Sequence, residues 1–302
     1  MAIPSVGPCP ETLPDPVAAL LPRCAFPPPG TPVDCAVSGG SDSTALLVLA
    51  TAAGLDVTAW HVDHGLRPGS ADEGRLVART AGSRGAAVLT VSAPIDDGPN
   101  LEERARDARR AVLPTGVLTG HTADDQAETV LWNLLRGSGV PGTAGIGEPD
   151  RRPLLALRRA ETRALCESLS LDVVDDPHNA EDRFTRNRIR HEVLPLMADV
   201  AGRDPVPLLA RHASLAGEAV GLLDVLAAEV DPTDVASVAD VGDDLVRLAI
   251  RRWLTASADG LPPDAASVDR VLDVVRGQAV ATEVVGGHRV RRSAGRLSHE
   301  RR

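Results

Sequence analysis

Residues 33–47 constrain this chain more than any other segment. They read VDCAVSGGSDSTALL, an apolar run, a turn with two glycines, and apolar residues at helical spacing. This order predicts a strand, a tight turn and the N-terminus of a helix. Gly39 and Gly40 allow positive φ angles and a close approach of the backbone to a ligand. Because a helix N-terminus presents free N–H groups and a positive dipole end, the segment predicts a phosphate-binding loop.

The side chains of this loop suit a magnesium-bound nucleotide. Ser38, Ser41 and Ser43 supply hydroxyl donors, and Asp42 supplies a carboxylate for Mg²⁺. A Walker A loop is excluded because it needs a lysine, whereas all 32 basic residues of this chain are arginines. The ordinary alternative at this point is a glycine-rich turn that only caps a helix.

Bulk composition sets the class of protein. A length of 302 residues allows one large domain and a smaller one, and 43% hydrophobic with 25% charged residues is typical of a soluble globular protein. A net charge of −10 argues against indiscriminate nucleic-acid binding but permits a local basic patch. The most apolar stretch is too short and too interrupted to span a membrane, so we expect a cytoplasmic protein. Cys9, Cys24, Cys35 and Cys166 show no metal-binding spacing and indicate reduced thiols.

The pattern along the chain predicts an α/β fold, with a parallel Rossmann-like sheet covered by helices on both faces. Strand-like runs alternate with helical patterns, and a Pro-rich segment precedes them. We expect a Pro-rich segment at 1–30, a nucleotide-binding catalytic domain at 31–200 and a small, mainly helical domain at 201–302. The expected strands are 33–37, 56–62, 86–92, 115–119 and, more weakly, 171–175. The expected helices are 15–21, 43–53, 70–84, 100–113, 123–136, 160–169, 205–229, 243–256 and 264–276, with a long loop at 137–158.

Two polar loops follow predicted strands, where parallel sheets bind ligands. The first is HVDHGLR, with His61, Asp63, His64 and Arg67; a plain polar loop explains it equally well, and HxDH alone is weak evidence for a metal. The second is GHTADDQAET, in which the carboxylates of Asp124, Asp125 and Glu128 share neighbouring helix faces.

Three acids in the first turns of a helix repel one another. The helix N-terminus offsets part of this repulsion. The remainder predicts a cation partner, either Mg²⁺ or a substrate ammonium, although a capped helix with solvated acids is also compatible.

A local positive site is predicted at residues 183–191, which hold four arginines and no acid. Arginine forks suit the phosphates of ATP or of RNA. An arginine-solvated helix face is the alternative. A second group of arginines lies near the C-terminus, between residues 289 and 302, and we interpret it as a basic tail that is compatible with RNA contact.

Taken in order over residues 33–200, the motifs resemble those of the tRNA(Ile)-lysidine synthetases of the PP-loop ATP pyrophosphatase superfamily, in their short form. They are SGGSDS, HVDHGLR, NLE at 100–102, DDQAET with LLRGSG, RRPLL, and DDPHN with RFTRNRIRHEVLP. The resemblance implies an adenine nucleotide alpha hydrolase-like fold. It implies that ATP adenylates the 2-carbonyl oxygen of the wobble cytidine in a tRNA(Ile) with a CAU anticodon. The ε-amine of free lysine then displaces AMP, which leaves lysidine on the tRNA.

The resemblance also implies a role for each matching residue. The expected catalytic residues are Asp42, Asp124, Asp125 and Glu128, with Asp42 and Asp124 as candidate Mg²⁺ ligands and Asp125 and Glu128 as lysine ligands. The expected ATP-binding residues are Ser38, Gly39, Gly40, Ser41, Asp42, Ser43, His61, Asp63 and His64. The expected RNA or phosphate ligands are Arg67, Arg136, Arg186, Asn187, Arg188 and Arg190. The chain departs from the family pattern where Gly120-His121-Thr122 replaces Ala-His-His and where His178 replaces serine.

Other members of the superfamily are the main rivals. Related tRNA thiolation enzymes need paired cysteines, which this sequence lacks, and amidating ligases mostly carry a glutaminase domain, for which no segment fits. A non-catalytic ATP-binding or RNA-binding regulator is disfavoured by the presence of all four acids, Asp42, Asp124, Asp125 and Glu128. A site that had lost its catalytic role would lose such destabilising acids first. The sequence leaves a homodimer open.

Overall fold

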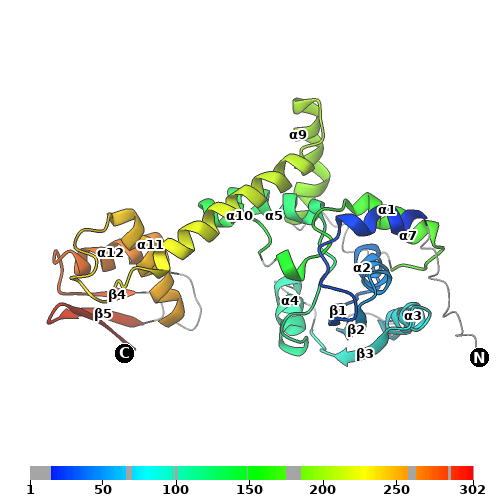
Figure 1. Ribbon diagram of the computed structural model, residues 1–302, viewed down its shortest axis with the longest axis horizontal. Helices are drawn as coiled ribbons and strands as arrows, with labels where there is room; N and C mark the ends of the chain where they lie inside the picture. Colours follow the sequence, from blue (N-terminus) through cyan, green and yellow to red (C-terminus); the bar gives the residue numbers. More distant parts are fainter. Residues whose placement is uncertain are drawn as a thin grey trace, which may run out of the picture. The chain divides into compact units, whose positions relative to one another are not determined.

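The computed structural model describes residues 15–65, 70–96, 98, 101–147, 149–174, 185–257, 263–284 and 287–301. The chain divides into two compact units, Met1–Ser214 and Leu215–Arg302. Most of the elements of both units are labelled in Figure 1. The division falls inside helix α10 (Val206–Ala228), whereas the expected boundary at 200/201 precedes this helix.

The first unit is built on a parallel sheet. Strands β1 (Pro32–Ala36), β2 (Asp56–Asp63) and β3 (Ala87–Ser92) lie in the order β1-β2-β3. The fourth predicted run contributes only a one-residue parallel bridge between Leu118 and Cys35, because a turn from Pro114 to Val117 precedes it. Leu118 lies on the other side of β1 from β2, so β1 is the point at which the strand order reverses. Parallel sheets bind ligands at this switch point, beyond the carboxyl ends of the strands.

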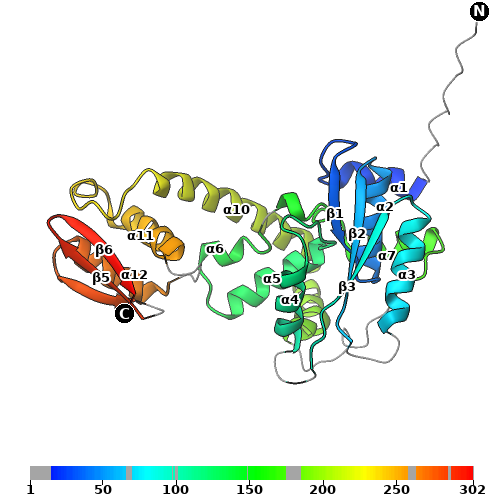
Figure 2. The same ribbon diagram turned by 90° about the horizontal axis from the view of Figure 1, so that it is seen from below.

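Helices cover both faces of this sheet, as predicted. Figure 2 shows α2 (Ser41–Ala52), α3 (Ser70–Gly82) and α7 (Arg159–Ser168) on one side and α4 (Leu101–Val112) and α5 (Ala123–Leu135) on the other. The shorter elements are α1 (Asp15–Leu20), η1 (Leu21–Arg23), α6 (Val140–Thr143), η2 (Pro149–Arg151), α8 (Thr185–Arg188), the π-helical turn η4 (Ile189–Val193) and α9 (Leu194–Ala201).

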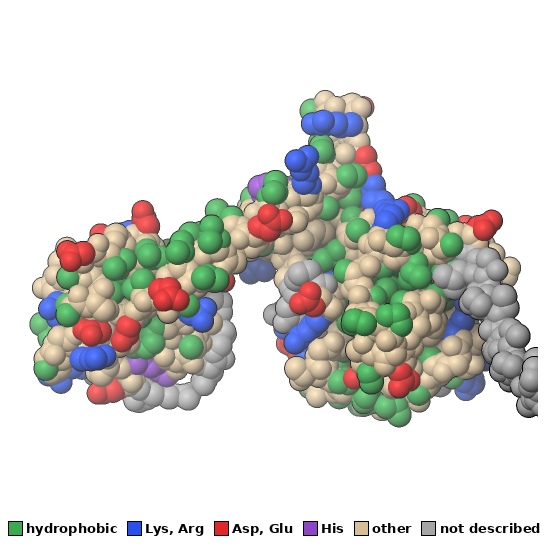
Figure 3. All heavy atoms as spheres, in the orientation of Figure 1, with side chains coloured by type: hydrophobic (Ala, Val, Ile, Leu, Met, Phe, Trp, Pro, Cys, Tyr) green, Lys and Arg blue, Asp and Glu red, His purple; other side chains and the backbone are tan. Residues whose placement is uncertain are grey.

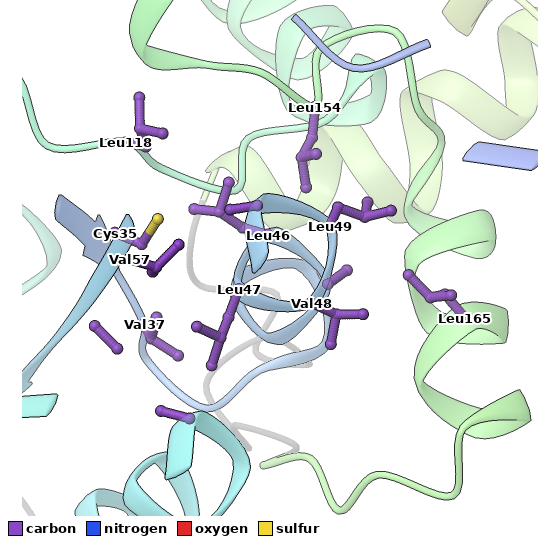
Figure 4. Close-up of a cluster of buried hydrophobic side chains, with 14 of the residues drawn as sticks. Cys35, Val37, Leu46, Leu47, Val48, Leu49, Val57, Leu118, Leu154 and Leu165 are labelled. Atoms are coloured by element: carbon purple, nitrogen blue, oxygen red, sulfur yellow. The ribbon is translucent and has the colours of Figure 1, made fainter. Parts of the chain in front are cut away.

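Helix α2 is the centre of the hydrophobic core. Four consecutive side chains, Leu46 to Leu49, are fully buried, and Figure 4 shows them pointing to different sides of the helix. They pack between the sheet, at Val57, and α7, at Leu165. A helix that is apolar all round must be enclosed. This packing fixes the N-terminus of α2, and with it residues 38–43, at the end of β1.

The weak strand predicted at 171–175 does not form within the described residues 171–174. This segment instead passes over the glycine turn, where the Val174 N–H donates to the Gly39 carbonyl at 2.9 Å. A Cβ on Gly39, which has a φ of +92°, would lie 3.1 Å from Val174 Cγ2. Glycine is therefore required at position 39 both by its conformation and by the close neighbour.

The second unit combines helices with a small antiparallel sheet. Helices α11 (Asp243–Ser257) and α12 (Ala265–Val275) precede strands β4 (Ala281–Val284), β5 (His288–Ser293) and β6 (Arg296–Arg301). The helices match the prediction, but the Arg-rich end is a sheet rather than a tail. Buried His288 and Val290 alternate with exposed Arg289 and Arg291, which is the two-residue period of a strand with one face covered.

Among the described residues, no helix has the length and apolar character that crossing a membrane requires.

Candidate active site at the end of the parallel sheet

Residues 38–43 form a closed turn that directs backbone N–H groups outward. The Ser38 N–H donates to Ser43 Oγ at 3.1 Å, and Ser43 Oγ donates to the Gly40 carbonyl at 3.0 Å. Within the described part of the chain, the N–H groups of Gly39, Gly40 and Ser41 have no acceptor. Free N–H groups at the start of a twelve-residue helix form an anion-binding geometry.

The loop after Leu118 lies directly against this turn. A Cβ on Gly120 would lie only 2.5 Å from the Asp42 carbonyl oxygen, so glycine is required for the approach. Thr122 then caps α5: its backbone N–H donates to Asp125 Oδ2 at 2.8 Å and its hydroxyl donates to the same oxygen at 3.0 Å. These contacts bring the first turn of α5 beside the first turn of α2.

One guanidinium joins the acids of the two helices. Arg159 approaches Asp42 through Nε at 3.4 Å, Asp125 through Nη2 at 2.7 Å and Glu128 through Nη1 at 3.0 Å. The Arg159 side chain is 25% exposed, and Glu128 is fully buried. In this structure an arginine of the chain itself therefore takes the place of the cation that the acid cluster predicts.

Asp124 holds the N-terminus of α7 in place. Its carboxylate accepts from Arg158 Nη2 at 2.9 Å and from Arg158 Nε at 3.0 Å, and it also accepts from the Arg159 N–H at 2.8 Å. Burial raises the pKa of Asp124, but these hydrogen bonds outweigh burial and hold the pKa below its ordinary value. Asp124 thus fixes the backbone from which the Arg159 side chain extends.

The pKa values of Asp42 and Asp125 are shifted in opposite directions, although both carboxylates contact Arg159. Burial, with a contribution from Asp125, raises the pKa of Asp42, although hydrogen bonds from Thr162 and Arg159 act against the shift. Burial also raises the pKa of Asp125, but the Arg159 charge and hydrogen bonds from Thr122 prevail and leave it below its ordinary value. The Thr162 hydroxyl donates to Asp42 Oδ1.

Glu128 has a second guanidinium partner. Arg190 donates to its two oxygens, at 2.7 and 3.1 Å, and Arg186 Nε lies 3.9 Å from Oε2. This convergence follows from packing, since Ile189 and Leu194 are buried against α5. Arg186 and Arg190 therefore point into the acid cluster.

The structure describes three of the remaining predicted RNA ligands. Arg188 is 60% exposed and pairs with Glu192 at 2.9 Å, Asn187 is buried, and Arg136 ends α5 with its guanidinium over the Trp132 ring. Arg67, together with the DDPHN motif, lies outside the described residues.

His61, Asp63 and His64 lie at the carboxyl end of β2, beside the glycine turn. The His61 ring nitrogen Nδ1 is 3.0 Å from the Val37 carbonyl, and His64 Nδ1 is 2.9 Å from the Ala93 carbonyl. Asp63 accepts from the Gly65 N–H at 2.9 Å. These bonds tie the end of β2 to the segments that follow β1 and β3. The predicted contact of the three residues with ATP stays a prediction.

His121 is expected to make the folded protein sensitive to acid. Burial, reinforced by nearby arginines, lowers the pKa of His121 from 6.5 to about 4, although Asp125 acts in the opposite direction. The unfolded chain therefore binds a proton between these pH values that the folded chain does not bind, and stability is lost as the pH falls through this window. We expect the wild-type free energy of unfolding to drop by about 2 kcal/mol more than that of His121→Gln between pH 7 and pH 5.

The measurement is urea denaturation of both proteins at a series of pH values. Identical pH dependence of the two proteins would show that the imidazole is not held neutral.

Sequence reasoning missed Arg158, Arg159 and Thr162. The acid cluster signalled a cation, but nothing local identified Arg159, which is 117 residues from Asp42. The pair of arginines directly before the α7 pattern was the available signal. Among the described residues, no group of three or more His, Cys, Asp or Glu side chains is arranged to hold a metal ion by itself.

Comparisons with known proteins bear on the family and the fold of this chain. Residues 25–197 match the model of the PP-loop domain family. A tRNA(Ile)-lysidine synthase from Nocardia farcinica is 43% identical, with 82% of this chain and 83% of that protein covered. Those from Rhodococcus jostii and Mycobacterium tuberculosis are 40% and 41% identical, covering 89% and 80% of this chain and 90% and 81% of their own. Among solved structures, a U34-tRNA thiolase from Methanococcus maripaludis superposes with a TM-score of 0.53 at 18% identity, covering 68% of this chain and 76% of that chain, which shows a shared fold.

Proposed function

The chain belongs to the tRNA(Ile)-lysidine synthase family and carries its PP-loop domain, and from this membership we propose that it joins lysine to the wobble cytidine of a tRNA(Ile) with a CAU anticodon. In the first step the cytidine O2 attacks the α-phosphorus of ATP and pyrophosphate leaves. In the second step the lysine ε-amine attacks C2 and AMP leaves. Because both substrates of the first step are cytoplasmic, the proposed reaction is placed in the cytoplasm.

The glycine turn is proposed to bind the phosphates of ATP. The N–H groups of Gly39, Gly40 and Ser41, with the positive end of α2, stabilise the charge that builds on the departing pyrophosphate. Asp42 and phosphate oxygens together form the all-oxygen donor set that Mg²⁺ prefers, so a metal held jointly with the substrate fits this site. Bound there, Mg²⁺ would neutralise phosphate charge. Asp124, with its oxygens engaged by α7, would then position α7.

Asp125 and Glu128 are proposed to bind the lysine ammonium in the second step. The observation that carries the proposal is that these two acids converge with Asp42 on one cation, Arg159, at distances of 2.7 to 3.4 Å. The cluster is therefore built to hold a positive group next to the nucleotide loop. An ammonium has three donors and can be shared between two carboxylates.

The rival thiolation chemistry needs a reactive thiolate. Burial is the main cause that raises the pKa of Cys24 to about 11, that of Cys35 to about 12 and that of Cys166 to about 11. Thiols with such pKa values stay protonated and unreactive near neutral pH. The three cysteines within the described residues therefore favour the ligase.

The decisive experiment incubates the protein with tRNA(Ile) transcript, ATP, Mg²⁺ and labelled lysine, followed by nucleoside analysis. We expect label in a modified cytidine at the wobble position, together with AMP and pyrophosphate. No change in the tRNA, or a modified nucleoside that carries no lysine label, would contradict the proposal. A transcript with cytidine-34 replaced by uridine is the matched control.

Arg188 is proposed to contact the tRNA backbone. On the face drawn in Figure 3, acidic and basic side chains are interspersed and form no broad basic surface. The Arg188 side chain is 60% exposed. We expect Arg188→Glu to weaken cognate and non-cognate tRNA alike and to reduce the slope of log affinity against log salt by about 0.9 per lost duplex phosphate contact. Filter binding over a salt series measures both quantities.

Arg110→Glu makes the same charge change at another exposed arginine, on α4, and serves as the control. Equal losses in the two variants would mean that net charge, and not a contact at Arg188, sets the affinity. Arg190 is unsuitable for this test because it holds Glu128.

A further inference from the structure

The two proposed substrate sites share a single side chain. Arg159 contacts Asp42, which belongs to the ATP loop, and it also contacts Asp125 and Glu128, which are proposed to bind lysine. Its backbone is held by Asp124, while its guanidinium is at the end of a long chain that is 25% exposed. The backbone of Arg159 is therefore held in place, whereas its guanidinium, which bridges the two sites, can move.

In this structure the proposed lysine site is already occupied by hydrogen-bond donors of the chain itself. Asp125 accepts two hydrogen bonds from Thr122 on one oxygen and Arg159 Nη2 on the other. Glu128 accepts Arg159 and Arg190 on Oε1 and Arg190 again on Oε2. An incoming ammonium thus finds both carboxylates neutralised, and it gains little by binding until a guanidinium leaves.

A bound triphosphate would change the charge around Arg159. It adds negative charge at the N-terminus of α2, beside Asp42, whose carboxylate is 3.4 Å from Arg159 Nε. A guanidinium fork fits phosphate oxygens at least as well as carboxylates, so Arg159 has a competing partner within a small movement of its present position. Arg190 remains on Glu128, because its contacts are made only with that acid among the described residues and do not reach Asp42.

We propose that Arg159 couples the two sites by moving from the acids to the phosphates when nucleotide binds, so that the lysine site opens only after ATP or the adenylated tRNA is in place. This inference rests on the proposed function and adds an order of binding to it. Arg159 is a positioning residue here. Its guanidinium occupies the ammonium site, and it leaves that site when nucleotide binds at the neighbouring one. By linkage, lysine must strengthen nucleotide binding by the same factor.

The test is calorimetric titration of L-lysine into the full chain, with and without Mg²⁺ and an ATP analogue whose α,β-bridging oxygen is replaced by methylene. For the wild type we expect the analogue to raise lysine affinity at least about tenfold, within the usual range of coupling between sites. In Arg159→Gln, lysine affinity without nucleotide should rise and the effect of the analogue should largely disappear. Arg163→Gln removes an exposed arginine from the same helix and should behave like the wild type.

The experiments distinguish a failure of the proposed coupling from a failure of the proposed function. Equal lysine affinity of the wild type in both conditions would overturn the coupling, even if Arg159→Gln did not fold. Undiminished coupling in a folded Arg159→Gln protein would overturn the role of Arg159. If the protein forms lysidine in the tRNA assay while either result is found, the proposed function stands and this inference fails. If it forms no lysidine and binds no lysine in either condition, both fail.

Discussion

Asp42→Asn will give a folded protein that no longer releases pyrophosphate from ATP at a useful rate. Asp42 lies in the first turn of α2, and it is the only carboxylate within residues 38–43. The amide keeps the size of the side chain and an acceptor for Thr162, but it removes the charge that would hold Mg²⁺ against the phosphates. We expect the tRNA-dependent rate of pyrophosphate release to fall by about 100-fold or more, the size of a lost transition-state charge contact.

Two measurements make this result specific. Asp107→Asn removes an acid from an exposed position on α4 and should retain the wild-type rate. Thermal unfolding should show that Asp42→Asn is folded, and it is expected to be slightly stabilised, because the raised pKa of Asp42 shows that burial disfavours its charged form. A folded Asp42→Asn protein with wild-type pyrophosphate release would exclude Asp42 from the first step.

The parts of the fold that were predictable depend on local sequence. The apolar run, the glycine turn and the apolar helix at residues 33–52 are neighbours in sequence, so their order identified β1, the loop and α2. The same holds for the amphipathic patterns of α11 and α12, whose predicted bounds differ from the observed ones by at most one residue at either end. Such patterns are set by which side chains face the core.

The parts that were not predictable depend on pairing between distant segments. Leu118 forms only one bridge with β1, because the turn that begins at Pro114 leaves no residues to extend the ladder. The β5 strand was obscured by its arginines, since the alternation of His288 and Val290 with exposed arginines was read as a charged tail. Arg159 reaches three acids on two other helices, and sequence offers no rule that selects one arginine among so many.

The structure also changes the interpretation of which cation pairs with the acid cluster. The sequence predicted that three crowded acids need a cation and left Mg²⁺ and a substrate ammonium as the choices. In the structure the guanidinium groups of Arg159 and Arg190 take the place of that cation and hold Asp125 and Glu128 in position. Because these carboxylates are already paired with arginines, an ammonium that binds to them has to compete with a guanidinium, and variants of these acids must be chosen to keep the arginines paired.

Glu128→Gln is therefore the variant that separates the two half-reactions. Alanine at this fully buried position would leave Arg159 and Arg190 facing an empty space, and breaking such a buried pair costs about 3–5 kcal/mol. Glutamine keeps the shape and one acceptor oxygen. It loses the charge that is proposed to hold the lysine ammonium, so we expect adenylated tRNA to accumulate and lysidine formation to fall by about 100-fold, while pyrophosphate release stays within a few-fold of the wild type.

The measurement follows both products in one reaction: pyrophosphate release for the first step, and labelled lysine in the tRNA for the second. Glu167→Gln, which changes a 69% exposed glutamate on α7, is the control and should leave both rates unchanged. High lysine concentration should restore part of the lysidine yield of Glu128→Gln, because the lost interaction is one of binding, and it should not restore the yield of Asp42→Asn. If both half-reactions of Glu128→Gln fell to the same extent, Glu128 would belong to the ATP site, and the lysine ammonium would have to bind elsewhere.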